Sequence, residues 1–266
     1  MPLYRLAILV CTSCLFSYGA YAMQSMQTTS SPFPDEQAAI NAYLENPNNL
    51  NATILAMTQH KYAQTFYAQF KEDKSTDTLR ISLEYLERAT EIAPNSPSIL
   101  KLRAAIFYDQ RAIIDFRTEA LSALEAYLAV APDDLVYQIL YVDFLMELGM
   151  WRSAAKASET AYTANPAFAQ DTLLDRMVAN YLSAGWPHRG IGFFDDQLKN
   201  SPSNPGLLLS KAILQRRVSD TIGARLSLGA VLLNRNANNQ QKETARKLRD
   251  HWSKAAPLDD TSQWPG

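Results

Sequence analysis

Cysteine is almost absent from this sequence of 266 residues. Its only two cysteines, Cys11 and Cys14, lie within the first 22 residues. A chain that has lost those residues contains no thiol, which excludes a disulfide, a cysteine nucleophile and a thiolate metal site. The stability of such a chain has to come from packing alone.

The segment that holds both cysteines, residues 1–22, has the pattern of a signal peptide. Arg5 precedes an apolar run from Leu6 to Phe16, and Ala20 and Ala22 are small residues at the positions that a signal peptidase recognises. We therefore expect an exported, periplasmic chain that begins at residue 23. The apolar run has about half of the roughly 20 residues that a membrane span needs, so an uncleaved anchor is the weaker alternative.

A lipid anchor at Cys14 is a second alternative. Thr12 and Ser13 are small residues of the kind that precede a lipidated cysteine, but Cys11 stands where a leucine is usual. Residues 23–34 are mainly Gln, Ser, Thr and Pro, which bury too little apolar surface to offset the entropy of ordering them. We expect a flexible leader there.

Glycine is also scarce, and neither positive nor negative charge is in large excess. With 9 glycines, no Val/Ile/Thr alternation and apolar residues at three- and four-residue steps, the sequence is typical of an all-helical protein. The formal net charge is −2, and no run of Lys and Arg with interleaved aromatics occurs. Nucleic acid and anionic membrane surfaces are therefore not expected partners.

Motifs that carry chemistry are missing as well. There is no glycine-rich phosphate loop and no Gly-x-Ser-x-Gly elbow, and the three histidines, His60, His188 and His251, are isolated from one another in sequence. Acidic pairs such as Asp133 with Asp134 stand where aspartate caps a helix. We predict no catalytic residue, no cofactor and no metal; an enzyme built around His60 or His188 is the weaker alternative.

Prolines are numerous and regularly placed. Five of them follow amphipathic runs at separations of 47, 38, 34 and 36 residues: Pro47, Pro94, Pro132, Pro166 and Pro202. Because proline lacks an amide donor and clashes with the preceding turn, each one marks the end of a helix. The period predicts a repeated unit of two helices.

The segment Ser82–Ser96 resembles the second helix of a tetratricopeptide repeat (TPR). Ser82 and Ala89 stand at the two small positions of that helix, Leu86 stands at the large one, and Pro94 closes the unit. The same pattern recurs less completely after Pro94 and drifts toward the C-terminus. Gly149 and Gly185 precede second helices, where a glycine permits a tight turn with positive φ.

The resemblance implies an all-α fold, a right-handed α-solenoid of antiparallel helix pairs over residues 35–256. We expect about five repeats, a lone capping helix at 35–44, a last capping helix at about 240–255, and a disordered tail at 257–266. Small residues allow neighbouring helices to pack closely, and each unit needs the next to cover its apolar surface.

In TPR proteins the first helices of the units line a concave groove, so the resemblance implies a groove that binds a protein or peptide partner. Counting from the closing prolines, the predicted partner-binding residues are Lys101, Tyr108, Asp109, Ile139, Asp143, Met146, Asp175, Arg176 and Arg216.

The implied function is a scaffold that holds proteins of the cell envelope together, in an assembly, secretion or export system. Regulation of a peptidoglycan synthase or hydrolase is the alternative. The choice among these systems rests on analogy, because a fold does not determine a function.

Overall fold

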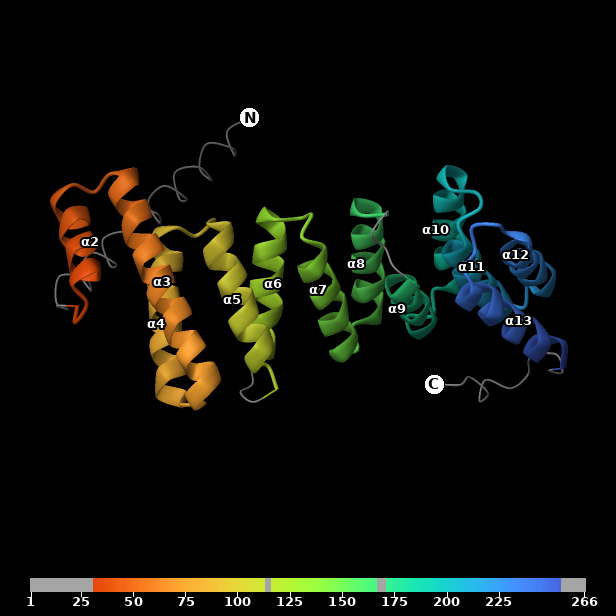
Figure 1. The fold of residues 1–266 in the computed structure, drawn as a ribbon, viewed down its shortest axis with the longest axis horizontal. Helices are drawn as coiled ribbons and strands as arrows, with labels where there is room; N and C mark the ends of the chain where they lie inside the picture. The colour runs from red at the N-terminus through yellow and green to blue at the C-terminus, as the bar shows by residue number, and fades with distance from the viewer. Residues whose placement is uncertain (1–30, 113–115, 167–170, 255–266) are drawn as a thin grey trace, which may run out of the picture. The chain divides into compact units, whose positions relative to one another are not determined.

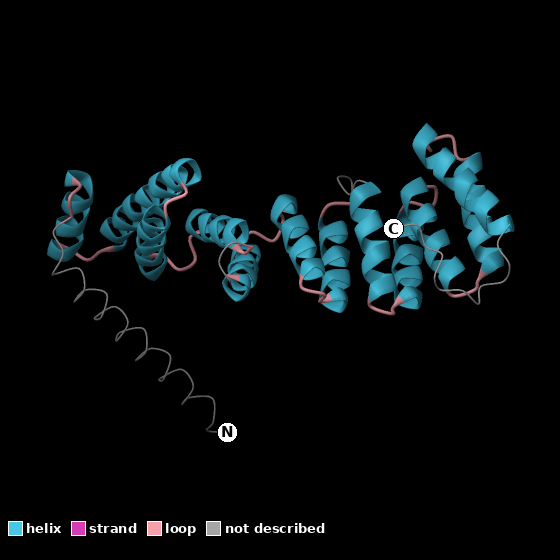
Figure 2. Ribbon diagram, turned by 90° about the horizontal axis from the view of Figure 1, so that it is seen from below, coloured by secondary structure: helices cyan, strands magenta, loops and turns pink. Residues whose placement is uncertain are grey.

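The structure is a computed structural model that describes residues 31–112, 116–166 and 171–254. The predicted signal peptide, most of the predicted leader and the predicted tail lie outside these residues. The described residues form helices α2 to α13 joined by short loops, and none of them is in a strand (Figure 2). The all-α prediction is therefore confirmed. Among the described helices, none combines the length and apolar character that a membrane crossing requires.

The chain divides into two compact units between Pro132 and Asp133. Unit 1 contains α2 (Pro34–Glu45), α3 (Asn49–Asp73), α4 (Thr76–Ile92), α5 (Pro97–Gln110) and α6 (Arg117–Val130). Unit 2 contains α7 (Leu135–Glu147), α8 (Trp151–Ala164), α9 (Asp171–Ser183), α10 (Pro187–Asn200), α11 (Pro205–Arg217), α12 (Thr221–Leu233) and α13 (Asn239–Lys254). Within each unit, consecutive helices pack as antiparallel pairs, such as α3 with α4 and α11 with α12 (Figure 1).

The prolines act as the sequence predicts. Pro94 follows the end of α4, Pro132 follows α6 and Pro202 follows α10, and the next helix begins three residues after each of them. Five helix pairs, from α3/α4 to α11/α12, are flanked by α2 and α13. This arrangement confirms the TPR-like fold with about five repeats and a helix at each end.

The small positions of the α4 helix allow it to approach α3 closely. The Ser82 hydroxyl donates a hydrogen bond of 2.8 Å to the backbone carbonyl of Ala63 on α3, and both residues are fully buried. Ala89 is also fully buried, in the same core cluster as Leu86. A longer side chain at Ser82 or Ala89 would push the two backbones apart.

The boundary between leader and helices differs slightly from the prediction. Pro34 is the first residue of α2, and Phe33 stacks on the ring of Tyr62 with 4.4 Å between centroids. The Ser31 hydroxyl donates a hydrogen bond to Glu36. These last residues of the predicted leader therefore pack on unit 1, because Phe33 supplies the large apolar surface that the rest of the leader lacks.

Gly149 and Gly185 adopt the positive φ values that were predicted, +69° and +70°. Each closes a turn in which the following amide reaches back five residues, with Met150 N–H bonded to Leu145 at 2.8 Å and Trp186 N–H to Tyr181 at 2.8 Å. In each turn the glycine amide also bonds three residues back, to Met146 and to Leu182, and the two bonds together satisfy the last carbonyls of the helix. Ser219, with φ +64°, occupies the same place between α11 and α12, without the freedom of glycine.

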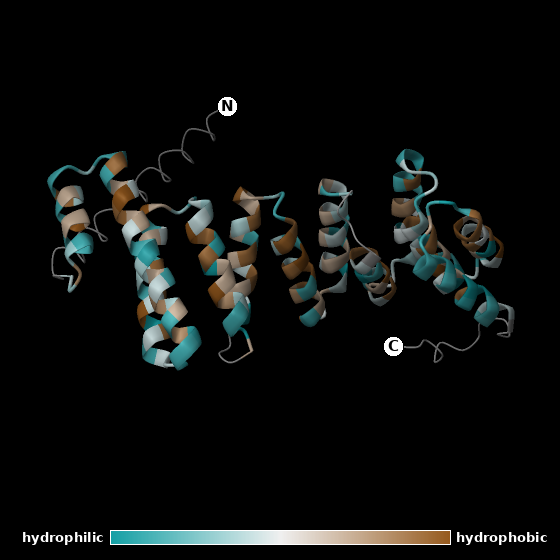
Figure 3. Ribbon diagram, in the orientation of Figure 1, coloured by the Kyte–Doolittle hydropathy of each residue, from teal (hydrophilic) through white to brown (hydrophobic). Residues whose placement is uncertain are grey.

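The C-terminal helix α13 covers the end of unit 2. Ala245 is fully buried, and Leu248 and Trp252 pack against the cluster formed by α11 and α12. The remainder of α13 is hydrophilic (Figure 3). One narrow apolar stripe on an otherwise polar helix is what a capping helix requires, since only one of its faces is buried.

Candidate functional site

The predicted groove residues of unit 1 contact their own chain. The Lys101 ammonium lies 5.7 Å from the centre of the Tyr127 ring, and the Arg111 guanidinium lies 3.9 Å from that of Tyr108. Asp109 accepts a 2.6 Å hydrogen bond from the Tyr67 hydroxyl on α3. The contacts of Lys101 and Asp109 join neighbouring helices, whereas that of Tyr108 lies at the end of α5, so Asp109 in particular is already engaged within the fold.

In unit 2 the structure brings two predicted groove residues together. Arg176 on α9 forms two hydrogen bonds to Asp143 on α7, of 2.5 and 3.0 Å. Their side chains are about one third exposed, 30% for Arg176 and 33% for Asp143. The resemblance predicts that the first helices of neighbouring repeats lie side by side, and this ion pair joins two of them. Because the two charges neutralise each other, they are less available to a partner.

The other predicted positions of unit 2 differ in exposure. Asp175 is exposed, whereas Ile139 and Met146 are half-buried. Arg216 is only 6% exposed, and its Nη1 donates a 3.3 Å hydrogen bond to the Thr221 hydroxyl. A side chain so deeply buried has little surface to offer a partner in this conformation. The concave groove as a binding surface stays a prediction.

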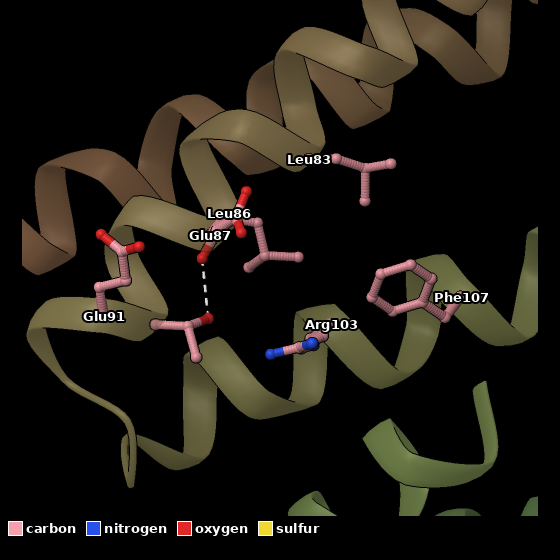
Figure 4. Close-up of a pocket in the computed structure, with 7 residues that line it drawn as sticks. Leu83, Leu86, Glu87, Glu91, Arg103 and Phe107 are labelled. Carbon is pink, nitrogen blue, oxygen red and sulfur yellow. Dashed lines mark hydrogen bonds between the residues drawn. The ribbon is translucent and has the colours of Figure 1, made fainter. Parts of the chain in front are cut away.

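A pocket of about 310 Å³ lies in unit 1 between α4 and α5, away from the predicted groove. Figure 4 shows the α4 residues facing the α5 residues across it. The residues that line it are Leu83, Leu86, Glu87, Thr90, Glu91, Arg103 and Phe107. On α5, residues 103 and 107 point about 120° or more away from 101 and 109 of the predicted groove, since each residue turns the helix by about 100°.

Apolar side chains form the floor of the pocket. Leu86 belongs to the buried core of unit 1, and Leu83 packs against that core. The Phe107 ring meets Phe116 edge to face, with 5.2 Å between centroids. The Thr90 hydroxyl donates a 2.8 Å hydrogen bond to the Leu86 carbonyl on its own helix (Figure 4). The floor is therefore held in place by contacts that already exist without a ligand.

Charged side chains stand around this floor on both sides. Glu87 and Glu91 lie one helical turn apart on α4, and Arg103 extends over the face of Phe107, with its guanidinium carbon 5.6 Å from the ring centre. A concave apolar surface with a few convergent charged groups is the usual form of a recognition site. The small residues of α4 predict only a packing role for this helix, so the pocket was not predicted from the sequence. Its signal is Leu83 and Phe107, two large apolar residues outside the packing stripes.

The histidines do not converge. His60 is buried on α3, where burial lowers its pKa below the usual 6.5 and a backbone hydrogen bond with Ser98 acts in the opposite direction. His188 and His251 are exposed on α10 and α13. In the part of the chain that the structure describes, no three His, Cys, Asp or Glu residues are grouped closely enough to hold a metal ion.

No protein-family model matches the chain, and no curated protein matches it. Its structure is similar to several solved structures. YrrB, described as a TPR protein with an unusual peptide-binding site, has 12% identity and a TM-score of 0.43, covering 80% of this chain and 99% of its own. The TPR protein TTC0263 of Thermus thermophilus has 15% identity and a TM-score of 0.37, covering 72% of this chain and 97% of its own. PilF of Pseudomonas aeruginosa has 16% identity and a TM-score of 0.39, covering 74% of this chain and 88% of its own.

Proposed function

We propose that this chain is an exported, periplasmic scaffold that binds a partner protein of the cell envelope, in an assembly, secretion or export system. The observation that carries the protein-binding part is the pocket between α4 and α5. It combines a preformed apolar floor with charged residues at its edges. Protein interfaces have this anatomy, an apolar centre surrounded by a polar rim.

The helix pairs supply the rigidity that such a site needs. The pocket residues belong to two helices, each of which packs against a partner helix, α4 on α3 and α5 on α6. A site on rigid elements loses little entropy when a ligand binds. We infer that the chain acts by holding a partner and not by transforming a small molecule.

Site-specific photo-crosslinking in intact cells tests this proposal. A benzophenone amino acid at Thr90 places the reactive group in the pocket, at Tyr108 it probes the predicted groove, and at Arg225 it probes an exposed part of α12 as the control. We expect a discrete adduct from Thr90, whose partner then binds the purified chain. An absence of adducts from both Thr90 and Tyr108, with the protein present at normal level, would contradict the scaffold function.

The location is tested separately by intact-mass analysis of the protein from the periplasmic fraction. We expect a mass that begins at Met23. A species that retains residues 1–22, or one that begins at Cys14 and carries lipid, would contradict this part of the proposal.

A further inference from the structure

The α4 side of the pocket carries two carboxylates that the described part of the chain does not neutralise. Glu87 and Glu91 line the pocket, are exposed, and have no ion-pair partner among the described residues. Glu84, one turn earlier on the same helix, does have a partner, because Arg80 binds it. The contrast indicates that α4 pairs its acidic residues away from the pocket and leaves them unpaired beside it.

The α5 side of the pocket has the opposite charge. Arg103 contacts the ring of Phe107 but has no carboxylate partner in the described ranges. An arginine stacked on an aromatic face keeps its planar donors free at the edge, where they match a carboxylate in geometry. The pocket is therefore polarised, with acidic groups on α4, a basic group on α5 and an apolar floor between them (Figure 4).

The volume limits what fits into this space. At about 310 Å³ the pocket is at the lower end of the range for ligand sites, roughly 300–1,000 Å³. It is partly open to solvent, so it accommodates a few side chains of a longer segment. Two carboxylates are also too few for a calcium site, which takes about six to eight oxygen ligands.

We propose that the pocket binds a segment of the partner protein that presents an apolar side chain between a basic and an acidic one. The apolar side chain rests on the half-buried Leu83 and Phe107, above the buried Leu86. The basic side chain lies between Glu87 and Glu91, and the acidic side chain pairs with Arg103. Charge complementarity of this kind fixes the direction in which the segment lies, because the reversed segment places like charges together. This inference rests on the proposed function and specifies the chemistry of its site.

Selection from a phage-displayed library of random dodecapeptides on the purified chain, residues 23–266, tests the inference. We expect the selected peptides to share a Lys or Arg and an Asp or Glu on opposite sides of a large apolar residue. A synthetic peptide with that consensus is then titrated by fluorescence anisotropy. The double variant Glu87→Gln/Glu91→Gln should weaken its binding about tenfold, which corresponds to about 1.4 kcal/mol.

The matched control removes the same number of charges elsewhere in unit 1. Glu45 and Glu72 are exposed near the C-terminal ends of α2 and α3, outside the pocket. The variant Glu45→Gln/Glu72→Gln should bind the peptide as the wild type does, which separates local pairing from net charge. Replacing the basic residue of the peptide by norleucine should weaken binding to the wild type but not to the Glu87→Gln/Glu91→Gln variant. Circular dichroism confirms that each variant is folded.

Three results would overturn the inference. If the selected peptides lack a basic residue, or bind the Glu87→Gln/Glu91→Gln variant unchanged, the site has another specificity while the scaffold function stands. If the wild type forms a dimer in sedimentation that this variant abolishes, the occupant is a second copy of the chain. If no peptide is selected and the crosslinker at Thr90 captures no protein, the inference fails. If the crosslinker at Tyr108 captures no protein either, the proposed function fails with it.

Discussion

Units 1 and 2 use their charged side chains in different ways. In unit 2, charges join helices: Asp143 pairs with Arg176, Lys211 with Asp195, and Glu159 with Arg189 at 2.7 Å. Unit 1 has such pairs as well, for example Lys61 with Asp35, but there Glu87, Glu91 and Arg103 surround a pocket without pairing with described residues. Similar helix pairs can thus use charged side chains to join helices or leave them available to a partner, so the unpaired charges are the better guide to the binding surface.

Unit 1 also contains the most deeply buried carboxylate that the structure describes. Glu36 on α2 is 1% exposed and accepts hydrogen bonds of 2.9 Å from both the Gln59 amide and the Tyr85 hydroxyl. Arg88 lies 3.9 Å away. Burial and the bond to Glu36 raise the pKa of Tyr85, because both disfavour its ionised form. The Glu36 carboxylate thus stabilises the packing of α2 on α3 and α4.

The largest expected effect is therefore that of Glu36→Ala. Removal of the carboxylate leaves the buried donors of Gln59 and Tyr85 without an acceptor, and such a loss costs about 3 kcal/mol. Urea unfolding followed by circular dichroism measures the change in free energy, and hydrogen exchange locates it in unit 1. Glu45→Ala, at the exposed end of α2, is the control and should shift stability by less than about 0.5 kcal/mol. Equal effects of the two variants would show that the hydrogen bonds of Glu36 to Gln59 and Tyr85 do not stabilise the packing of α2.

The next effect concerns close packing in unit 2. A Cβ atom on Gly190 would lie 2.4 Å from Leu214 and 2.5 Å from the Tyr181 ring, whereas one on Gly192 would meet nothing within 4 Å. Gly190→Ala should therefore lower the stability of unit 2 by about 1–3 kcal/mol. Gly192→Ala, on the same helix, should raise it by up to about 1 kcal/mol, since alanine is the better helix former. Thermal unfolding of both variants checks this, and a change of the same sign in both would refute the packing argument.

A smaller effect is expected from the ion pair between α7 and α9. Because Asp143 and Arg176 are about one third exposed, water screens their attraction, and a double-mutant cycle with Asp143→Asn and Arg176→Gln should give a coupling of about 1 kcal/mol. The coupling should decrease at 1 M salt. A coupling near zero at low salt would show that this ion pair contributes nothing to holding α7 and α9 together. The contrast between the two units would then be weaker.

The smallest effect is that of Ser219→Gly. Ser219 holds a φ of +64° at the turn where Gly149 and Gly185 stand in equivalent positions. Relief of the left-handed conformation, about 1–2 kcal/mol, is partly offset by the entropy of glycine in the unfolded chain, about 0.4–1 kcal/mol. We expect a gain of about 0.5 kcal/mol in the unfolding free energy of unit 2. The reverse substitution, Gly149→Ser, should lower it, and a loss from both would mean that Ser219 is not strained.

The repeat could be predicted from the sequence because its determinants are local. A proline ends a helix through its own missing amide, and a glycine accepts positive φ through its own missing Cβ, so Pro94 and Gly149 act wherever the chain places them. Ser82 and Ala89 were predicted as close-packing positions from the resemblance to the second helix of a TPR, in which small residues let two helices approach closely. The positive φ of Ser219 was not predicted, because a serine does not favour the left-handed conformation that this turn requires.

The binding surface depended on contacts between residues far apart in the chain. The sequence placed Asp143, Arg176 and Arg216 correctly on first helices, but it could not show that Asp143 and Arg176 pair with each other or that Arg216 is buried. Nor could it show that Glu87 and Arg103 face one another across an apolar floor. Helical periodicity determines which face a side chain occupies, whereas its availability depends on what the neighbouring helix brings within a few ångströms, and only the tertiary structure decides that.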